Sequence, residues 1–145
     1  MITVERTVLV NHGAEQMYAL VEDVESYPRF LPWCSRSEVA LRESRRTVAT
    51  LYIDFHGLRG RFTTENAIEP ARSVDMKLVS GPFRRLEGHW RFHALGDNAC
   101  RVEFGLSWEF SSALLEKLVG PAFRKIADGM VEAFVQQAQK RFGVQ

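Results

Sequence analysis

The sequence predicts an α+β fold in which a strongly twisted antiparallel sheet wraps around a long C-terminal helix. Residues 36–110 alternate between apolar and polar with a period of two, most clearly in 100–110. This alternation is typical of an antiparallel sheet that is covered on one face. Turn residues such as Gly81 and Pro82 separate the alternating runs. Apolar residues then recur at steps of three or four from Leu115 to Ala138, which predicts one long amphipathic helix.

Composition and charge indicate a single folded domain spanning residues 1–145. Of the 145 residues, 46% are apolar and 26% are charged, which excludes wholesale disorder. A chain of this length can bury a core without metal or disulfide support. The net charge is +1, so no overall field attracts a polyanion, and we expect no DNA partner. Residues 36–61 nevertheless carry six Arg and three acids, which leaves a local anion-binding patch as an open interpretation.

The cysteines and the hydropathy pattern indicate the compartment. Cys34 and Cys100 lie far apart and form no CxxC motif. We expect two free buried thiols in a reducing compartment, and one disulfide is the alternative. The N-terminus lacks the pattern of a signal peptide, and no apolar run reaches the ~18 residues of a membrane span. We therefore expect a soluble, cytoplasmic protein, with a peripheral location at the inner face of the membrane as a further expectation.

The N-terminal region is expected to contain one strand and one short helix. The alternation from Ile2 to Val10 predicts the strand, and apolar residues at helical spacing predict a helix over 14–24. Gly13 is the expected N-cap of that helix, and Gln16 stands where a capping-box partner would. Two prolines in 27–34 predict an end to regular structure. That stretch is too apolar for a plain surface loop, so it must be buried or cover something.

We expect about six further strands between residues 36 and 110, each with one apolar face. The positions sharing that face begin with Ala49, Leu51, Ile53 and Phe55, followed by Leu58, Gly60, Phe62, Thr64 and Asn66, and by Val74, Met76 and Leu78. The last two strands show this apolar face most clearly. Its positions are Leu86, Gly88, Trp90, Phe92 and Ala94 in the first of them, and Cys100, Val102, Phe104, Leu106, Trp108 and Phe110 in the second.

The C-terminal helix is predicted from Ser112 to Phe142, with Ser111 and Ser112 as candidate caps and Gly143 as its end. Pro121, after Gly120, cannot donate to the carbonyl four residues earlier, so we expect a kink or a restart there. A helix held in the concave face of a twisted sheet leaves a space between them unless side chains fill it.

Candidate catalytic and metal-binding residues are few. No nucleophile elbow, zinc-protease motif or phosphate-binding glycine loop occurs. His89 and His93 share a strand face but lie about 13 Å apart, too far for one metal ion. Asp54 and His56 could form an acid–base pair about 7 Å apart, although the wet face of a strand is the simpler interpretation. We therefore expect no catalysis in the apolar interior.

Two groups of residues have both a structural and a functional interpretation. The aromatic stripe on the last two strands is either ordinary core or one wall of a site for a bulky lipid-like molecule. The arginine clusters are either solvated faces or contacts to phosphates of lipid headgroups or RNA. These clusters are Arg42, Arg45 and Arg46, then Arg59 and Arg61, and finally Arg84 and Arg85.

Several motifs resemble one known family. Residues 14–28, the run Phe30-Leu-Pro-Trp-Cys34, Gly81-Pro-Phe83 and Phe110-Ser-Ser112 are similar to the coenzyme Q-binding START-like family across nearly the whole chain. That family has the helix-grip fold, also seen in polyketide cyclase-like and birch-allergen-like proteins. The resemblance implies a cavity for ubiquinone or a similar polyprenyl lipid, without catalysis or a required cofactor, in support of respiration. For the family's ribosome-association toxin branch it implies binding to the large ribosomal subunit and a block on subunit association.

The sequence therefore predicts a non-catalytic protein that binds a hydrophobic ligand, foremost a polyprenyl quinone, between sheet and helix. Two alternatives stay open. One is a toxin-like protein that binds the large ribosomal subunit, and the other is a cyclase-type enzyme, which would need polar groups converging in the pocket. The predicted ligand-binding residues are Trp33, Leu51, Phe62, Met76, Trp90, Phe92, Phe104, Leu106 and Trp108 from the sheet side, and Phe123, Ile126 and Met130 from the helix.

Overall fold

The computed structural model describes residues 1–143, and in that range seven strands form one antiparallel sheet. The elements in chain order are β1 (Ile2–Val10), α1 (Ala14–Glu22), the 3-10 turn η1 (Val24–Ser26), α2 (Tyr27–Phe30), β2 (Cys34–Glu43), β3 (Arg46–Phe55), β4 (Leu58–Glu69), β5 (Ser73–Ser80), β6 (Phe83–Ala94), β7 (Cys100–Phe110) and α3 (Ala113–Phe142). The predicted α+β class and helix-grip arrangement are confirmed. The last two residues of the predicted domain lie outside the described range.

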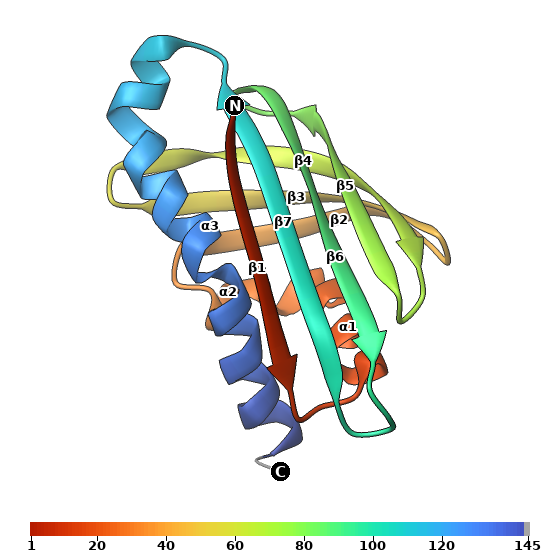
Figure 1. Cartoon of the computed structure of the whole chain (residues 1–145). Helices are drawn as coiled ribbons and strands as arrows, with labels where there is room; N and C mark the ends of the chain where they lie inside the picture. The colour runs from red at the N-terminus through yellow and green to blue at the C-terminus, as the bar shows by residue number, and fades with distance from the viewer. Residues whose placement is uncertain (144–145) are drawn as a thin grey trace.

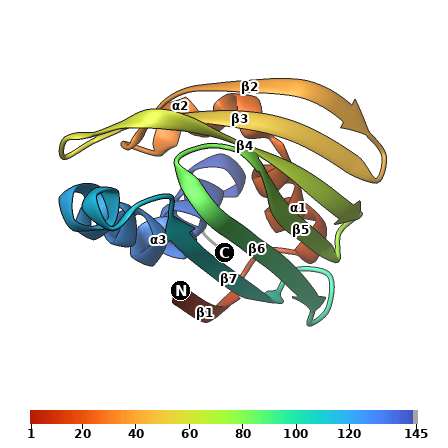
Figure 2. The same ribbon diagram turned by 90° about the horizontal axis from the view of Figure 1, so that it is seen from above.

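The sheet order is β1-β7-β6-β5-β4-β3-β2, so every strand after β1 pairs with its neighbour in the chain, and β1 pairs with β7. In Figure 1, β1, β7 and β6 run down the view while β2, β3 and β4 run across it, which is the strong twist expected of the sheet. Seen from above, the sheet curves around α3, with β2–β4 on one side of the helix and β1, β6 and β7 on the other (Figure 2).

The two faces of the sheet differ as the alternation predicts. On β7, Val102, Phe104 and Trp108 are buried against the helix side, while Arg101, just before them, is exposed. The outer face carries ion pairs, for example between Arg91 and Asp75, whose side chains approach to 2.8 Å. The core therefore lies between the concave face of the sheet and α3.

The segment after β1 differs in part from the sequence expectation. Helix α1 begins as predicted, and the Gly13 amide donates to Gln16 Oε1 at 3.1 Å. The predicted irregular stretch at Tyr27 is wrong, because Tyr27–Phe30 forms a helical turn with proline in its first positions. Proline suits those positions because their N–H groups have no partner inside the helix. The Tyr27 side chain is buried, and its hydroxyl donates to the carbonyl of Val21.

Helix α3 runs unbroken from Ala113 to Phe142, so the restart alternative at Pro121 is wrong, and the kink alternative stays a prediction. Buried residues on the following turns, such as Phe123 and Ile126, pack against the sheet and support the helical path through the proline. Of the two candidate caps, Ser112 is confirmed, since its Oγ accepts from the Leu115 amide at 3.1 Å.

Both cysteines are free and buried, as predicted. Burial raises the pKa of the Cys34 and Cys100 thiols to about 11, so both stay protonated near neutral pH. Among the helices of residues 1–143, none is long and apolar enough to cross a membrane.

Candidate functional site

A narrow, mainly apolar cavity lies between the sheet and α3. Its walls come from η1, α2, the strands β3 to β7 and the middle of α3. Ten of the twelve predicted residues border it, namely Trp33, Leu51, Phe62, Met76, Trp90, Phe104, Leu106, Phe123, Ile126 and Met130. The pattern of residues facing inward therefore locates a common space, while ligand contact by these residues remains a prediction.

Two predicted residues, Phe92 and Trp108, do not border the cavity. Phe92 lies near the end of β6, where Tyr18 of α1 covers it edge-on with ring centroids 6.0 Å apart. Trp108 is fully buried behind Phe123, at 4.9 Å between ring centroids, and its indole N–H has no hydrogen-bond partner within residues 1–143. Both residues face inward as the alternation predicts, but other side chains separate them from the cavity.

Sequence reasoning missed seven residues that border the cavity. They are Val24, Tyr27, Ala49, Thr64, Asn66, Leu86 and Phe134. Thr64 and Asn66 share a strand face with Phe62, so a search for polar residues on the apolar face finds them. Tyr27 gives no such signal, because the expected irregular segment hides the helical turn that aims its ring inward.

Two aromatic clusters form around the α3 residues of the cavity wall. The Phe123 ring packs against Phe83 and Phe110, with ring centroids 5.1 and 5.7 Å away. About three turns farther along α3, Phe134 contacts the rings of Tyr27 and Trp90 at 5.4 and 5.0 Å. Both phenylalanines border the cavity, so α3 supplies one ring of each cluster to its wall.

The cavity has a volume of about 60 Å³. Sites for drug-sized ligands usually measure roughly 300–1,000 Å³, so this space holds a few water molecules but not a quinone ring. Met76 and Met130 on its border are only partly buried, and methionine side chains change conformation easily. The structure is therefore a closed form, and a larger occupant requires side chains or α3 to move.

Polar groups are scarce in the cavity wall. Tyr27 is the one ionisable residue among those bordering the cavity in the described chain, and burial raises its pKa above the ordinary value. The Thr64 hydroxyl donates to Asn66 Oδ1 at 2.9 Å. This wall can hold an apolar molecule, and it offers few groups for proton transfer.

The other candidate catalytic and metal-binding residues lie on the outer surface. His93 Nε2 lies 2.8 Å from Glu103 Oε2, and the ring of His89 covers Gly105. Asp54 pairs with Arg59, while His56 lies in the β3–β4 turn. Within residues 1–143, no group of three His, Cys, Asp or Glu side chains is placed to hold a metal ion.

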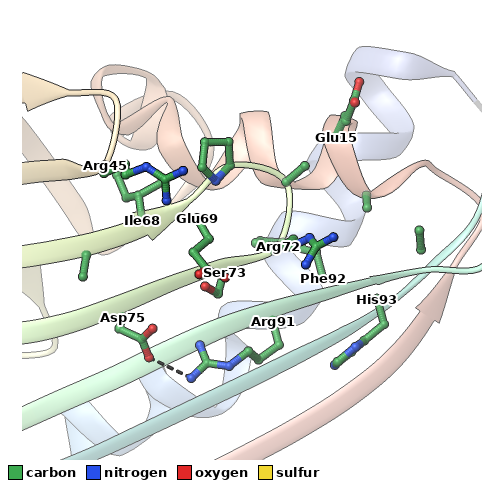
Figure 3. Close-up of a pocket in the computed structure, with 15 residues that line it drawn as sticks. Glu15, Arg45, Ile68, Glu69, Arg72, Ser73, Asp75, Arg91, Phe92 and His93 are labelled. Carbon is green, nitrogen blue, oxygen red and sulfur yellow. Dashed lines mark hydrogen bonds and ion pairs between the residues drawn. The ribbon is translucent and has the colours of Figure 1, made fainter.

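A second, more open pocket lies on the outside, between the β4–β5 turn, the end of β6 and the start of α1 (Figure 3). We call it the outer cleft, and its volume is about 1000 Å³. Arg45, Arg72 and Arg91 line it together with Glu15, Glu69 and Asp75. Figure 3 shows the Arg91–Asp75 pair across neighbouring strands.

Four of the predicted surface arginines, namely Arg42, Arg46, Arg59 and Arg84, have acidic partners in the molecule. The Arg42 guanidinium donates to both oxygens of Glu25 at 3.0 and 2.9 Å. Arg46 pairs with Glu65. Arg45 and Arg72 in the outer cleft are exposed, and neither forms an ion pair within residues 1–143. These two are thus the cations of the outer cleft that are free to meet an external anion.

Comparison with known proteins supports the same fold and family. The chain is 42% identical to the ribosome association toxin RatA of Vibrio cholerae, with 99% of each chain covered. It is 33% identical to coenzyme Q-binding protein COQ10 homolog B, mitochondrial, of Xenopus laevis, over 94% of this chain and 58% of that protein. The crystal structure of the ZhuI aromatase/cyclase from Streptomyces sp. R1128 matches with a TM-score of 0.85 at 18% identity, covering 97% of this chain and 95% of that one.

A family model supplies the assignment. The model described as polyketide cyclase / dehydrase and lipid transport matches residues 10–135, which include the cavity wall from Val24 to Phe134. The chain therefore belongs to the polyketide cyclase/dehydrase and lipid transport family.

Proposed function

We propose that this protein binds a hydrophobic, lipid-like ligand without catalysis, foremost ubiquinone or another polyprenyl quinone, in support of respiratory electron transport. The observation that carries the proposal is the apolar cavity closed between the sheet and α3. An apolar wall with few polar groups suits a bulky lipid, because burying apolar surface drives such binding. The similarity to a relative named as a coenzyme Q-binding protein supports the quinone as first candidate.

Binding requires the closed form to open. A quinone ring needs more than the present volume of about 60 Å³. The partly buried Met76 and Met130 side chains can rotate away, and movement of α3 would widen the space between it and the sheet. A ligand taken from a bilayer also implies a peripheral contact of a cytoplasmic protein with the inner face of the membrane. No cofactor is needed for this role.

The test combines ligand identification with one substitution. Lipid extraction and native mass spectrometry of the chain purified from its own host identify what the protein carries. Leu106→Trp should then abolish quinone retention, because the larger ring fills a space bordered by Leu106. Overpacking costs about 1–3 kcal/mol, so the variant should still fold. Leu9→Trp, on the exposed side of β1, is the matched control. Unchanged quinone retention in a folded Leu106→Trp variant would contradict the proposal.

A second candidate function is association with the large ribosomal subunit, which would block subunit joining. The observation that favours it is the 42% identity to a RatA toxin over nearly the whole chain. Arg45 and Arg72 in the outer cleft are suitable contacts for RNA phosphates, since both are exposed. Arg42 and Arg46 are less suitable, because acidic neighbours already bind them.

Co-sedimentation with large ribosomal subunits tests the second function. Replacing Arg45 and Arg72 by Glu should abolish co-sedimentation at low salt, while replacing Lys117 and Lys125 on α3 by Glu, with the same charge change, should not. Binding of the parent should also weaken with salt, by about 0.7–0.9 logarithmic units of affinity per logarithmic unit of salt for each phosphate contacted. A parent that does not sediment, or sediments regardless of salt, eliminates this function and leaves lipid binding intact.

A further inference from the structure

A polar pair interrupts the apolar wall of the cavity. Thr64 and Asn66 lie two residues apart on β4, so their side chains point to the same face. Both border the cavity, and their exposed fractions are 7% and 6%. Strand β4 pairs with β3 on one side and β5 on the other, which fixes the backbone under both residues. The pair therefore stands on a strand that is hydrogen-bonded on both sides.

The hydrogen bond within the pair leaves binding capacity unused. The Thr64 hydroxyl donates to Asn66 Oδ1 at 2.9 Å. A side-chain amide has one carbonyl oxygen and two N–H donors, and this bond engages the oxygen alone. Thr64 thus orients the amide by its oxygen and leaves the N–H donors of Asn66 for a group inside the cavity. Burying an amide among apolar side chains is unfavourable unless its groups find partners.

We propose that Asn66 Nδ2 donates a hydrogen bond to an acceptor oxygen of an otherwise apolar ligand, and that Thr64 positions the amide for this bond. The inference rests on the proposed lipid-binding function and narrows its ligand class. The ligand carries a carbonyl oxygen at the end that lies against β4, and its hydrocarbon part lies along the aromatic and aliphatic wall. A quinone has this chemistry, whereas a plain hydrocarbon lacks the acceptor.

Other hydroxyl groups in or near the cavity wall already have hydrogen-bond partners. The hydroxyl of Tyr27, the other polar group considered above, already donates to the Val21 carbonyl. Across the β3–β4 ladder, Asn66 faces Thr47, whose hydroxyl is directed to Glu22 at 3.4 Å. Trp33 and Trp90 also border the cavity and carry one indole N–H donor each. The Thr64–Asn66 pair differs from them in that a hydrogen bond within the pair orients its donors, which suits it to select between ligands of similar apolar bulk.

Two probes that differ in their oxygens test the proposal on the full chain. One is decyl-ubiquinone, which carries carbonyl oxygens, and the other is decylbenzene, which carries none. Retention of each probe is measured by native mass spectrometry for the parent, Asn66→Leu, Thr64→Val and Thr64→Ser. Leu has the branched shape of Asn with methyl groups in place of its polar atoms, Val removes the Thr64 hydroxyl, and Ser keeps it.

Asn66→Leu should weaken decyl-ubiquinone binding roughly 3- to 10-fold, the worth of one hydrogen bond, and leave decylbenzene binding unchanged. Thr64→Val should cause a smaller selective loss, which Thr64→Ser restores, because the hydroxyl acts through the amide. If the Asn66→Leu variant does not fold, Asn66→Val replaces it in the test, because valine also lacks the amide and is favoured in strands.

The outcomes separate the two proposals. If the parent retains neither probe, the proposed lipid-binding function fails. If the parent retains both and Asn66→Leu weakens both equally or neither, the polar pair does not select the ligand and this inference is overturned. A loss confined to the quinone supports it.

Discussion

The two parts of α3 on either side of Gly120 and Pro121 differ in how firmly they are held. From Ala113 to Val119 no side chain is fully buried, and Leu114 and Leu118 are 65% and 67% exposed. From Gly120 onward, buried residues recur on every turn, through Phe123 and Ile126 to Phe134 and Ala138. We call these parts the outer segment (113–119) and the anchored segment (120–142).

The anchored segment is also tied to other elements by charge. Asp128 accepts from Arg6 of β1 at 2.7 Å, and Arg141 donates to Asp23 at 3.0 Å. Regions with few buried contacts open at a lower free energy than the core. The outer segment is therefore expected to open at a lower free energy than the anchored segment, which carries the α3 residues of the cavity wall.

The largest expected difference between the segments is in stability. Phe134→Ala should lower the free energy of unfolding by about 3–5 kcal/mol, because it removes a buried ring that packs on Tyr27 and Trp90. Leu118→Ala should change it by less than about 0.5 kcal/mol, since that side chain is exposed. Urea unfolding followed by circular dichroism measures both. Equal losses would mean that the two segments are held alike.

Pro121 tests whether the boundary acts as a hinge. Pro121→Ala supplies an N–H that can donate to the Lys117 carbonyl and should stabilise α3 by about 1–2 kcal/mol, less than the full penalty of an interior proline. A firmer connection should slow ligand exchange several-fold, which stopped-flow fluorescence of Trp33 and Trp90 records. If the variant exchanges decyl-ubiquinone as fast as the parent, the boundary is not the hinge.

The proposed contact with a bilayer would involve the exposed apolar face of the outer segment. Leu114 and Leu118 lie one turn apart, and Lys117 is exposed between them. Leu114→Ser with Leu118→Ser should reduce co-sedimentation with phosphatidylglycerol vesicles by about tenfold, through loss of apolar contact. Leu9→Ser is the control, because Leu9 is equally exposed but lies on β1. The same loss in the control would show that no particular face meets the bilayer.

The smallest expected effect concerns the ion pair at the end of the anchored segment. Burial alone would raise the pKa of Asp23, but hydrogen bonds from Ser26 and Arg141 outweigh it and lower the pKa. Because the folded pKa lies below the unfolded value, the stabilisation is present above about pH 4 and is lost as pH falls further. Arg141→Met should cost about 0–1 kcal/mol and flatten the stability profile below pH 4. An unchanged profile in pH-dependent urea unfolding would exclude this contribution.

Much of the fold could be predicted from residue patterns. The alternation of Val102, Phe104 and Leu106 with polar neighbours places the core on one face of β7, as observed. Caps at Gly13 and Ser112 locate two helix starts, because the chemistry of a cap is local. Most of the sheet residues that border the cavity could therefore be identified without knowledge of the structure.

The residue patterns could not predict which inward-facing residues border the cavity, because this depends on where each residue lies along its strand. Phe92 and Phe104 both face inward, yet α1 covers Phe92 while Phe104 borders the cavity. The same limit applies to Trp108, which lies behind Phe123. Residue patterns did not predict the helical turn at Tyr27, because Pro28 and Pro32 indicate an end to regular structure when tertiary packing is ignored.

The sequence by itself determined the order of strands and helices, the apolar face of each and the family to which the chain belongs. Side-chain period and cap chemistry are properties of neighbouring residues, so they can be read from the chain. The tertiary structure alone decided that the cavity is closed to about 60 Å³ and that Thr64 and Asn66 provide its polar pair. The cavity volume is the small difference between the volume enclosed by the curved sheet and α3 and the volume of the side chains that fill this space. It is set only when distant segments pack together.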